Sequence, residues 1–385
     1  MVLRSNFAKN ENVPPTPPSK LSISRLRSCL QDATRKRHAR DPEAQRSRKY
    51  AIEQAKRRST KTAGTLRLPV KLTSSRPLPT IQDVEMKDAD PVLSSPGSAS
   101  PNIVKFLPIL LPKELARPEY CEVSKDAIRA VEPDLTDVHP DYIREQLVTF
   151  GPAWLQVVSS VRANSVKDSL PTELTIVVHD LSAALPTHML AVYGPLPKQN
   201  PSARRRVTLY PAHSLIFAAH CAKLPPFSPV LLPAREAEGD VPQEVTVPIQ
   251  PLLLPSPQTY ALLTAFLYTK RVDVLLRTLM PPGCPLPLKL EDKSQTALQS
   301  FAARLAGTYT PQMLLQQTMT VQGLWQNVCA LGVFDDELWD TMDLAWKVLL
   351  TAISISTGNP RAMGIKPESD ATGGPKKARA QSAGL

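Results

Sequence analysis

The chain has 385 residues and a formal net charge of +11, with 40 prolines against only 14 glycines. Such a proline content is typical of extended segments, so we predict one compact core with long tails rather than two domains. The positive charge belongs to the ends, because residues 1–80 carry 19 Lys and Arg against 5 Asp and Glu, whereas residues 81–360 carry 22 against 28. A basic arm of this kind favours nuclear targeting, nucleic-acid contact or contact with an anionic surface.

Three classes of protein are disfavoured by simple patterns. No stretch approaches the roughly 20 apolar residues that a membrane-spanning helix needs. Val2 and Leu3 are followed at once by Arg4, which does not fit a secretory signal. The five cysteines are odd in number and form no C-x-x-C pair, which predicts reduced thiols. We therefore expect a soluble intracellular protein that makes no membrane contact.

Residues 1–102 are predicted to form a disordered basic arm. Within it, weak patterns predict marginal helices at about residues 24–30 and 42–58. The second helix has few apolar residues to bury, so we expect it to order on a partner. The Ser- and Pro-rich stretch from Thr60 to Pro101 predicts a flexible linker. Thr16, which precedes a proline, and the Ser-Pro pairs are candidate phosphorylation sites.

Residues 103–355 are predicted to form a single α+β core, in which a small mixed sheet is flanked by helices and followed by a helical C-terminal part. Residues 356–385 are predicted to be a disordered basic tail. We expect the strands at residues 173–180 and 187–194 to pair. The predicted strands are 173–180, 187–194, 207–210 and 244–254, and the predicted helices are 124–131, 137–147, 152–162, 211–221, 255–276, 295–305, 311–330 and 335–353.

Three basic clusters in the arm are the strongest chemical signal. They lie about ten residues apart, a spacing that suits the acidic grooves of an import receptor and equally suits phosphates. Base stacking is disfavoured because Tyr50 is the lone aromatic residue there. Nuclear import, direct contact with DNA or RNA, and a merely solvated helix face stay open. The candidate contact residues are Arg35, Lys36, Arg37, Arg40, Arg46, Arg48, Lys49, Lys56, Arg57 and Arg58.

Catalytic and metal chemistry find little support in the residue patterns. His213, His220 and Cys221 are candidate metal ligands, but no fourth ligand for tetrahedral zinc lies nearby in the sequence. The acidic run at residues 335–337 falls at a predicted helix start, where carboxylates complement the helix dipole, and the run at residues 268–271 falls at a helix end. No motif of a nucleophilic, phosphate-binding or zinc enzyme is present. We predict no catalytic residue, no metal and no cofactor.

The segments "RRRVTLYPAHSLIFAAHC" and "PSPQTYALLTAFLYTKRVDVLL" resemble those of a BTB/POZ interaction domain. This resemblance implies a BTB-like core that works through protein contacts. Long connections at Pro195 and Leu231 depart from a lean BTB core, so a homodimer and a ubiquitin-ligase adaptor role stay open. The residues expected to build the interaction core are His213, Phe266, Tyr268, Trp325, Trp339 and Trp346.

A closer resemblance is carried by "YPAHSLIFAAHCAKLPP", by "LWQNVCALGVFDDELWDTMDLAWKVLL" and by the arm segment "CLQDATRKRHARDPEAQRSRKYAIEQAKRR". These segments resemble the clampless protein family of basidiomycete fungi, over about residues 103–353 and part of the arm. The resemblance implies a regulator of sexual development that is needed for clamp connections in the dikaryon and acts in the pathway of the mating-type homeodomain transcription factors. It also implies a nuclear location, with nucleocytoplasmic shuttling as the alternative.

Together these observations predict a non-enzymatic regulator that acts by protein–protein interaction. The expected partners are nuclear proteins such as homeodomain transcription factors, together with an import receptor. Two alternatives stay open: a nucleic-acid-binding regulator that uses the basic arm, and a BTB-type ubiquitin-ligase adaptor.

Overall fold

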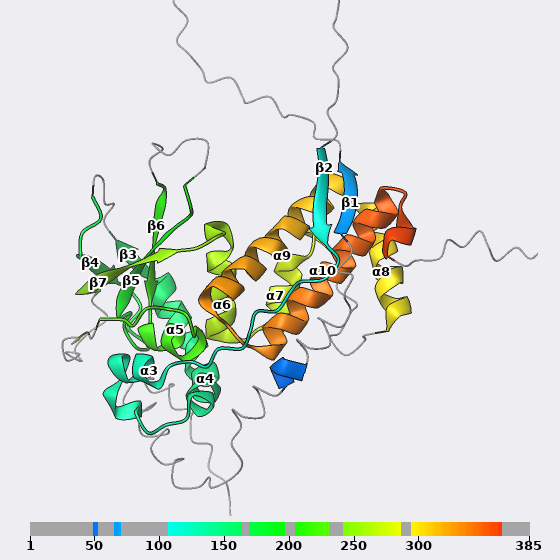
Figure 1. The fold of residues 1–385 in the computed structure, drawn as a ribbon. Coiled ribbons are helices and arrows are strands. Elements are labelled where there is room, and N and C mark those ends of the chain that lie inside the picture. The colour runs from blue at the N-terminus through cyan, green and yellow to red at the C-terminus, as the bar shows by residue number, and fades with distance from the viewer. Residues whose placement is uncertain are drawn as a thin grey trace, which may run out of the picture. The chain divides into compact units, whose positions relative to one another are not determined.

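The computed structural model describes residues 49–52, 65–70, 107–163, 169–196, 205–228, 230, 242–285 and 294–363. The predictions for Thr16, for a helix near residues 24–30 and for the tail beyond residue 363 lie outside these ranges. Within them the fold is mixed α/β, with a small five-stranded sheet and a helical C-terminal part (Figure 1). This confirms the predicted α+β class.

From residue 173 onward the elements follow one another in the order that the sequence patterns indicate. The prediction of a single helix at 255–276 was wrong, because the chain forms separate helices at Pro257–Thr259, Tyr260–Thr269 and Val272–Leu279, with Lys270 in the left-handed conformation between the last two. The described strands are β1 (Thr65–Val70), β2 (Leu107–Pro112), β3 (Val161–Ala163), β4 (Glu173–Val178), β5 (His188–Tyr193), β6 (Val207–Ala212) and β7 (Gln243–Leu253). The described helices are α3 (Lys125–Val131), η1 (Pro133–Leu135), α4 (Pro140–Ser159), α5 (Ser214–His220), η2 (Pro257–Thr259), α6 (Tyr260–Thr269), α7 (Val272–Leu279), α8 (Gln295–Thr308), α9 (Pro311–Leu331), α10 (Asp336–Ser356) and η3 (Pro360–Met363). None of these helices is long and apolar enough to cross a membrane.

Two compact units are formed by the chain. The first contains residues 1–61, 116–282 and 319–345, and the second contains residues 62–115, 283–318 and 346–385. The prediction that residues 103–355 form a single core stays a prediction.

β1 lies inside the range predicted to be linker and pairs with β2, from Thr65 opposite Pro112 to Val70 opposite Leu107. This difference has a local cause, because Leu66, Leu68 and Val70 alternate at the strand period within a Ser- and Pro-rich stretch.

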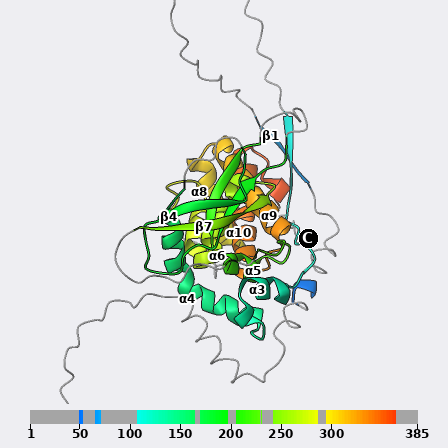
Figure 2. The ribbon, with the colours of Figure 1, turned by 90° about the vertical axis from the view of Figure 1, so that its left-hand side faces the viewer.

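The five-stranded sheet of the first unit has the order β3-β4-β7-β5-β6. β7 pairs antiparallel with β4 through residues 243–248 and parallel with β5 through residues 249–253; Figure 2 shows β4 and β7 side by side. The expected direct pairing of β4 with β5 was therefore wrong, because the long β7 lies between them. Each half of β7 is paired on one side only, so the sheet tolerates Pro248 and Pro251, which cannot donate a ladder hydrogen bond.

Helix α4 is continuous through Pro152, where the sequence predicted two separate helices. That prediction was wrong because burial outweighs local propensity. Leu147, Trp154 and Val157 are all buried on the same helix, which compensates for the hydrogen bond that the proline cannot donate. Helices α3, α4 and α5 lie together below the sheet in the view of Figure 1, and α4 packs against both α5 and α6.

A glycine permits the close approach of α4 to α6. A Cβ atom at Gly151 would lie only 1.9 Å from the backbone oxygen of Tyr268. Because that neighbour is backbone, no side-chain rotation can relieve the overlap, and the two helices would have to separate.

We predict that Gly151→Ala lowers the free energy of unfolding by at least about 2 kcal/mol, as overpacked cores do. The matched control is Gly307→Ala in α8, where an added Cβ meets nothing within 4 Å. That control should stay within about 1 kcal/mol of the parent, since alanine is the better helix former. Urea unfolding of the full chain checks both, and equal stability of the two variants contradicts the close helix contact.

Candidate functional site

A buried aromatic cluster in the first unit fixes the helices that carry the candidate site. Trp154 of α4, His213 before α5 and Tyr268 of α6 are each at most 1% exposed. The His213 ring stacks on Trp154 at 4.7 Å between ring centroids and meets the Tyr268 ring edge-on at 5.8 Å. His213 is the N-cap of α5, so that helix begins after it, and Pro211 lies in β6 rather than at the expected helix start.

The hydrogen bonds of His213 assign its protons. Its Nε2 lies 2.9 Å from the carbonyl oxygen of Ala184, which can only accept, so Nε2 carries the proton and donates. Nδ1 then accepts from the Tyr268 hydroxyl at 3.1 Å, and the same hydroxyl accepts the backbone N–H of His213 at 2.9 Å. Burial lowers the pKa of His213 to about 4, which keeps the ring neutral. His213 therefore holds the start of α5 and the end of α6 together, and both of its ring nitrogens have hydrogen-bond partners.

His220 and Arg144 meet at the far end of α5. The His220 ring is buried, and its Nδ1 lies 2.8 Å from the carbonyl oxygen of Ile216 one turn back. Arg144 of α4 donates through Nε to the carbonyl oxygen of Ala219 at 2.6 Å and through Nη1 to Asp141 at 2.6 Å. Because the last carbonyls of a helix lack partners within it, Arg144 caps α5 from outside.

Lys270 and Asp335 join the end of α6 to the start of α10. Lys270 has the left-handed backbone angle φ of 52° and ends α6, and its Nζ lies 2.8 Å from Asp335 Oδ2. The other oxygen of Asp335 accepts the backbone N–H of Leu338 at 3.0 Å, as an N-cap does. Burial lowers the pKa of Lys270. Burial also acts to raise the pKa of Asp335. The ion pair and hydrogen bond with Lys270 outweigh this effect, so the pKa of Asp335 lies below its ordinary value.

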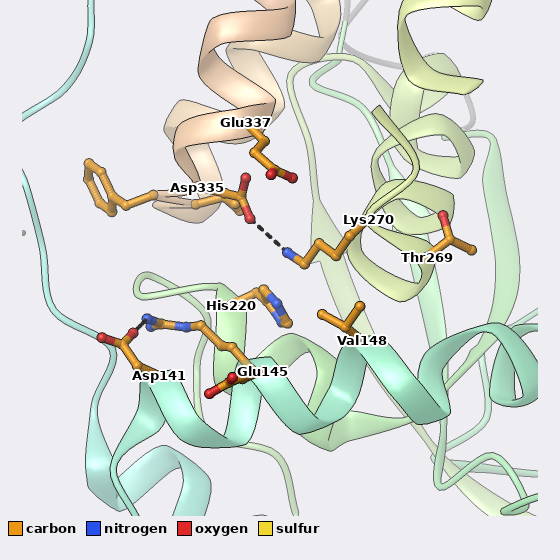
Figure 3. Close-up of a pocket in the computed structure, with 11 residues that line it drawn as sticks. Asp141, Glu145, Val148, His220, Thr269, Lys270, Asp335 and Glu337 are labelled. Carbon is orange, nitrogen blue, oxygen red and sulfur yellow. Dashed lines mark hydrogen bonds and ion pairs between the residues drawn. The ribbon is translucent and has the colours of Figure 1, made fainter. Parts of the chain in front are cut away.

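These groups surround a pocket of about 580 Å³ that lies wholly within the first unit. Figure 3 shows His220 between Lys270 and the α4 residues, with Asp335 and Glu337 coming from the start of α10. The lining residues are Asp141, Arg144, Glu145, Val148, His220, Thr269, Lys270, Val333, Phe334, Asp335 and Glu337. The pocket combines two internal ion pairs with a buried histidine.

Residues 49–52 of the basic arm pack beside this pocket. They are helical and lie within the predicted helix at 42–58. Tyr50 is 5% exposed, and its ring stacks on Tyr120 at 5.4 Å and meets Phe334 edge-on at 5.4 Å. Lys49 forms an ion pair with Asp336. Tyr50 thus finds its apolar partners within the chain, whereas the sequence suggested an external one.

The structure places the predicted site residues as follows. Of the basic set, Lys49 is paired with Asp336, and the other nine residues lie outside the described ranges. Phe266 is buried in α6, with the ammonium of Lys270 5.1 Å from its ring centroid. Each of three tryptophans donates its indole N–H to a carbonyl: Trp325 to Ala116 at 2.7 Å, Trp339 to Val333 at 3.1 Å and Trp346 to Pro112 at 3.1 Å.

The pocket itself was not predicted from the sequence. The patterns explained Lys270 as a helix end, residues 335–337 as a helix start, and His220 as a candidate metal ligand. Among the described residues no three His, Cys, Asp or Glu side chains gather as a metal site. The unusual feature of this place is structural, because Lys270 follows α6 in the left-handed position where glycine or asparagine usually stands.

Two family models match the chain. The model described as the clampless protein 1 N-terminal domain matches residues 118–255, and the one described as the clampless protein 1 C-terminal domain matches residues 273–382. The chain belongs to the clampless protein family. Membership indicates a regulator of clamp formation in fungi. Comparison with curated proteins and with solved structures gave no match. The BTB-like character of this clampless core is not confirmed and stays a prediction.

Substitution of Asp335 separates its two roles. Asp335→Asn keeps an oxygen that can accept from Leu338 but loses the charge that pairs with Lys270, and we expect a loss of about 2 kcal/mol in the free energy of unfolding. Asp335→Ala also loses the cap and should cost about 1 kcal/mol more. Urea unfolding of both variants measures the difference. Two variants as stable as the parent would contradict both roles.

Stability should fall in mild acid because three histidines, His188, His213 and His220, are buried as neutral rings. Burial lowers the pKa of His188 and of His213 to about 4 and that of His220 well below its ordinary value. Below about pH 6.5 the unfolded chain binds protons that the folded chain does not, so each histidine lowers the free energy of unfolding by up to about 1.4 kcal/mol per pH unit.

The measurement is urea unfolding of the full chain between about pH 7 and pH 5, repeated with His220→Gln. This variant should show a pH slope shallower by up to about 1.4 kcal/mol per unit. An unchanged slope would mean that His220 is not buried as a neutral ring.

Proposed function

We propose that this clampless protein is a non-enzymatic regulator of fungal sexual development that acts through protein–protein contacts in the mating-type homeodomain pathway. Membership of the clampless family supports the developmental role. The protein-contact mechanism is supported by the ion pairs that the pocket side chains form with one another. Lys270 is held by Asp335 and Arg144 by Asp141, so both cations that line the pocket are engaged in structural ion pairs. Such an arrangement favours binding over turnover.

The nucleus is the proposed location, with import receptors reading the basic arm. The three basic clusters of residues 35–58 support this, because they carry the charge that acidic receptor grooves bind. Lys49 belongs to the second cluster and is paired with Asp336. The first and third clusters therefore supply most of the charge for a receptor.

One alternative is nucleic-acid binding through the same arm, which the charge of residues 1–80 favours. It differs from the main proposal in its salt dependence, because phosphate contacts release counterions and weaken steeply with salt. A ubiquitin-ligase adaptor is the other alternative, and it requires co-purification of a cullin.

The test uses the full-length chain, tagged in fungal cells that are forming clamps. Deleting residues 1–101 is unsuitable, since it removes β1, which pairs with β2, and Tyr50, which packs on Phe334. The comparison variant instead replaces the basic residues at 35–37, 40 and 56–58 by glutamine and keeps Lys49. Affinity purification and mass spectrometry are carried out on both proteins, and imaging follows their location.

We expect both proteins to capture the same nuclear regulators from lysate, homeodomain factors among them, while the glutamine variant fails to accumulate in the nucleus. A wild-type chain that enriches only chromatin, in a way lost at high salt and in the glutamine variant, would replace this proposal with the nucleic-acid alternative.

A further inference from the structure

The charges that line the pocket do not balance. Its wall carries four carboxylates, from Asp141, Glu145, Asp335 and Glu337, against the two cations Arg144 and Lys270. The two cations are taken by Asp141 and Asp335 at 2.6 and 2.8 Å. Glu145 and Glu337 are exposed and form no ion pair within the described part of the chain. With His220 neutral, the pocket holds two carboxylates in excess.

His220 adds a further hydrogen-bond acceptor beside these two carboxylates. Its Nδ1 faces the Ile216 carbonyl, which can only accept, so Nδ1 carries the proton and Nε2 keeps a bare lone pair. Nε2 is buried and has no hydrogen-bond partner in the described structure. A buried acceptor left unpaired costs about 1–3 kcal/mol, which an entering donor can recover. Both free carboxylates and this nitrogen can therefore accept hydrogen bonds from a ligand that carries donors.

The apolar part of the wall suits the stem of a long cationic side chain. Val148 of α4 lines the pocket and is 44% exposed. Lysine and arginine bury their methylene stems on such surface while the charged end binds acceptors. A volume of about 580 Å³ also leaves room for the adjoining peptide backbone.

A neighbouring contact shows that this face accepts lysine. The turn that supplies Phe334, Asp335 and Glu337 to the pocket also supplies Asp336, which pairs with Lys49. The positive φ of 66° at Gly332 and the bridge between Cys221 and Val333 hold this turn against the end of α5. Two residues of this acidic turn are thus engaged by lysines, Asp335 by Lys270 and Asp336 by Lys49, while Glu337 is still open.

We propose that this pocket binds a lysine or arginine side chain presented by a basic segment of a partner protein. The inference rests on the proposed function and deepens it, because it names the chemistry by which a partner is recognised. The single positive charge of the ligand offsets one of the two excess carboxylates, and its N–H groups supply the donors that Glu145, Glu337 and His220 lack.

The test is a titration of the full-length chain, labelled with ¹⁵N-histidine, with short peptides. The probes are acetyl-Gly-Gly-Arg-Gly-Gly-amide, its lysine twin and its citrulline twin, which keeps the shape of arginine without the charge. His220→Gln assigns the His220 ring signals. The arginine and lysine peptides should shift these signals saturably, and the citrulline peptide should bind at least about tenfold more weakly, because charge-assisted hydrogen bonds are the stronger ones.

The pocket variant is Glu145→Gln with Glu337→Gln, and it should weaken binding of the arginine peptide on the order of tenfold. Its matched control is Glu173→Gln with Glu244→Gln, which removes two exposed carboxylates on β4 and β7 outside the pocket. The control should bind within about twofold of the parent, since distant exposed charges are screened.

Equal binding of the citrulline peptide, equal weakening in both variants, or no shift with either cationic peptide overturns the inference. Spermidine binding at least about tenfold tighter than the arginine peptide also overturns it, in favour of a small-molecule cation. The proposed function is judged separately. If the Glu145→Gln, Glu337→Gln chain captures the same nuclear partners as the parent, this inference fails while the protein-contact proposal stands.

Discussion

One carboxylate organises the candidate site. Asp335 binds the ammonium of Lys270 through Oδ2 and caps α10 at Leu338 through Oδ1. Lys270 in turn occupies a left-handed position that usually takes glycine or asparagine, and the ion pair with Asp335 gives a physical reason for a lysine there. The end of α6 and the start of α10 are thereby held together across 65 residues of sequence. This contact, together with the bridge between Cys221 and Val333, fixes the pocket wall on that side.

The aromatic core fixes the positions of α4 and α5, which form the other walls of the pocket. Tyr268 precedes Lys270 by two residues and is tied to His213, while His213 begins the helix that His220 ends. Gly151 lets α4 lie against this same segment, which brings Arg144 and Glu145 into reach. Thus the pocket follows from core packing, and its unbalanced charges are carried on a rigid frame, which is the condition for selective binding.

Sequence patterns predicted the elements whose signals are local. The helix starting after Asp335 and the capped helix after Ser124 were found because period and caps agree. β7 between β4 and β5, and the passage of α4 through Pro152, depend on tertiary pairing and burial that no local window contains. The pocket was missed for the same reason: each member has a sufficient local explanation, and only folding brings residues from α4, α5, α6 and α10 together.

The central claim is that Lys270 and Asp335 stabilise the fold by acting on each other. A double-mutant cycle with Lys270→Met and Asp335→Asn, followed by urea unfolding of the full chain, measures this directly. The account predicts a coupling free energy of at least about 1.5 kcal/mol, with the double variant more stable than the sum of the single losses implies. Losses that add within about 0.5 kcal/mol would show that the two residues act independently and would contradict the account.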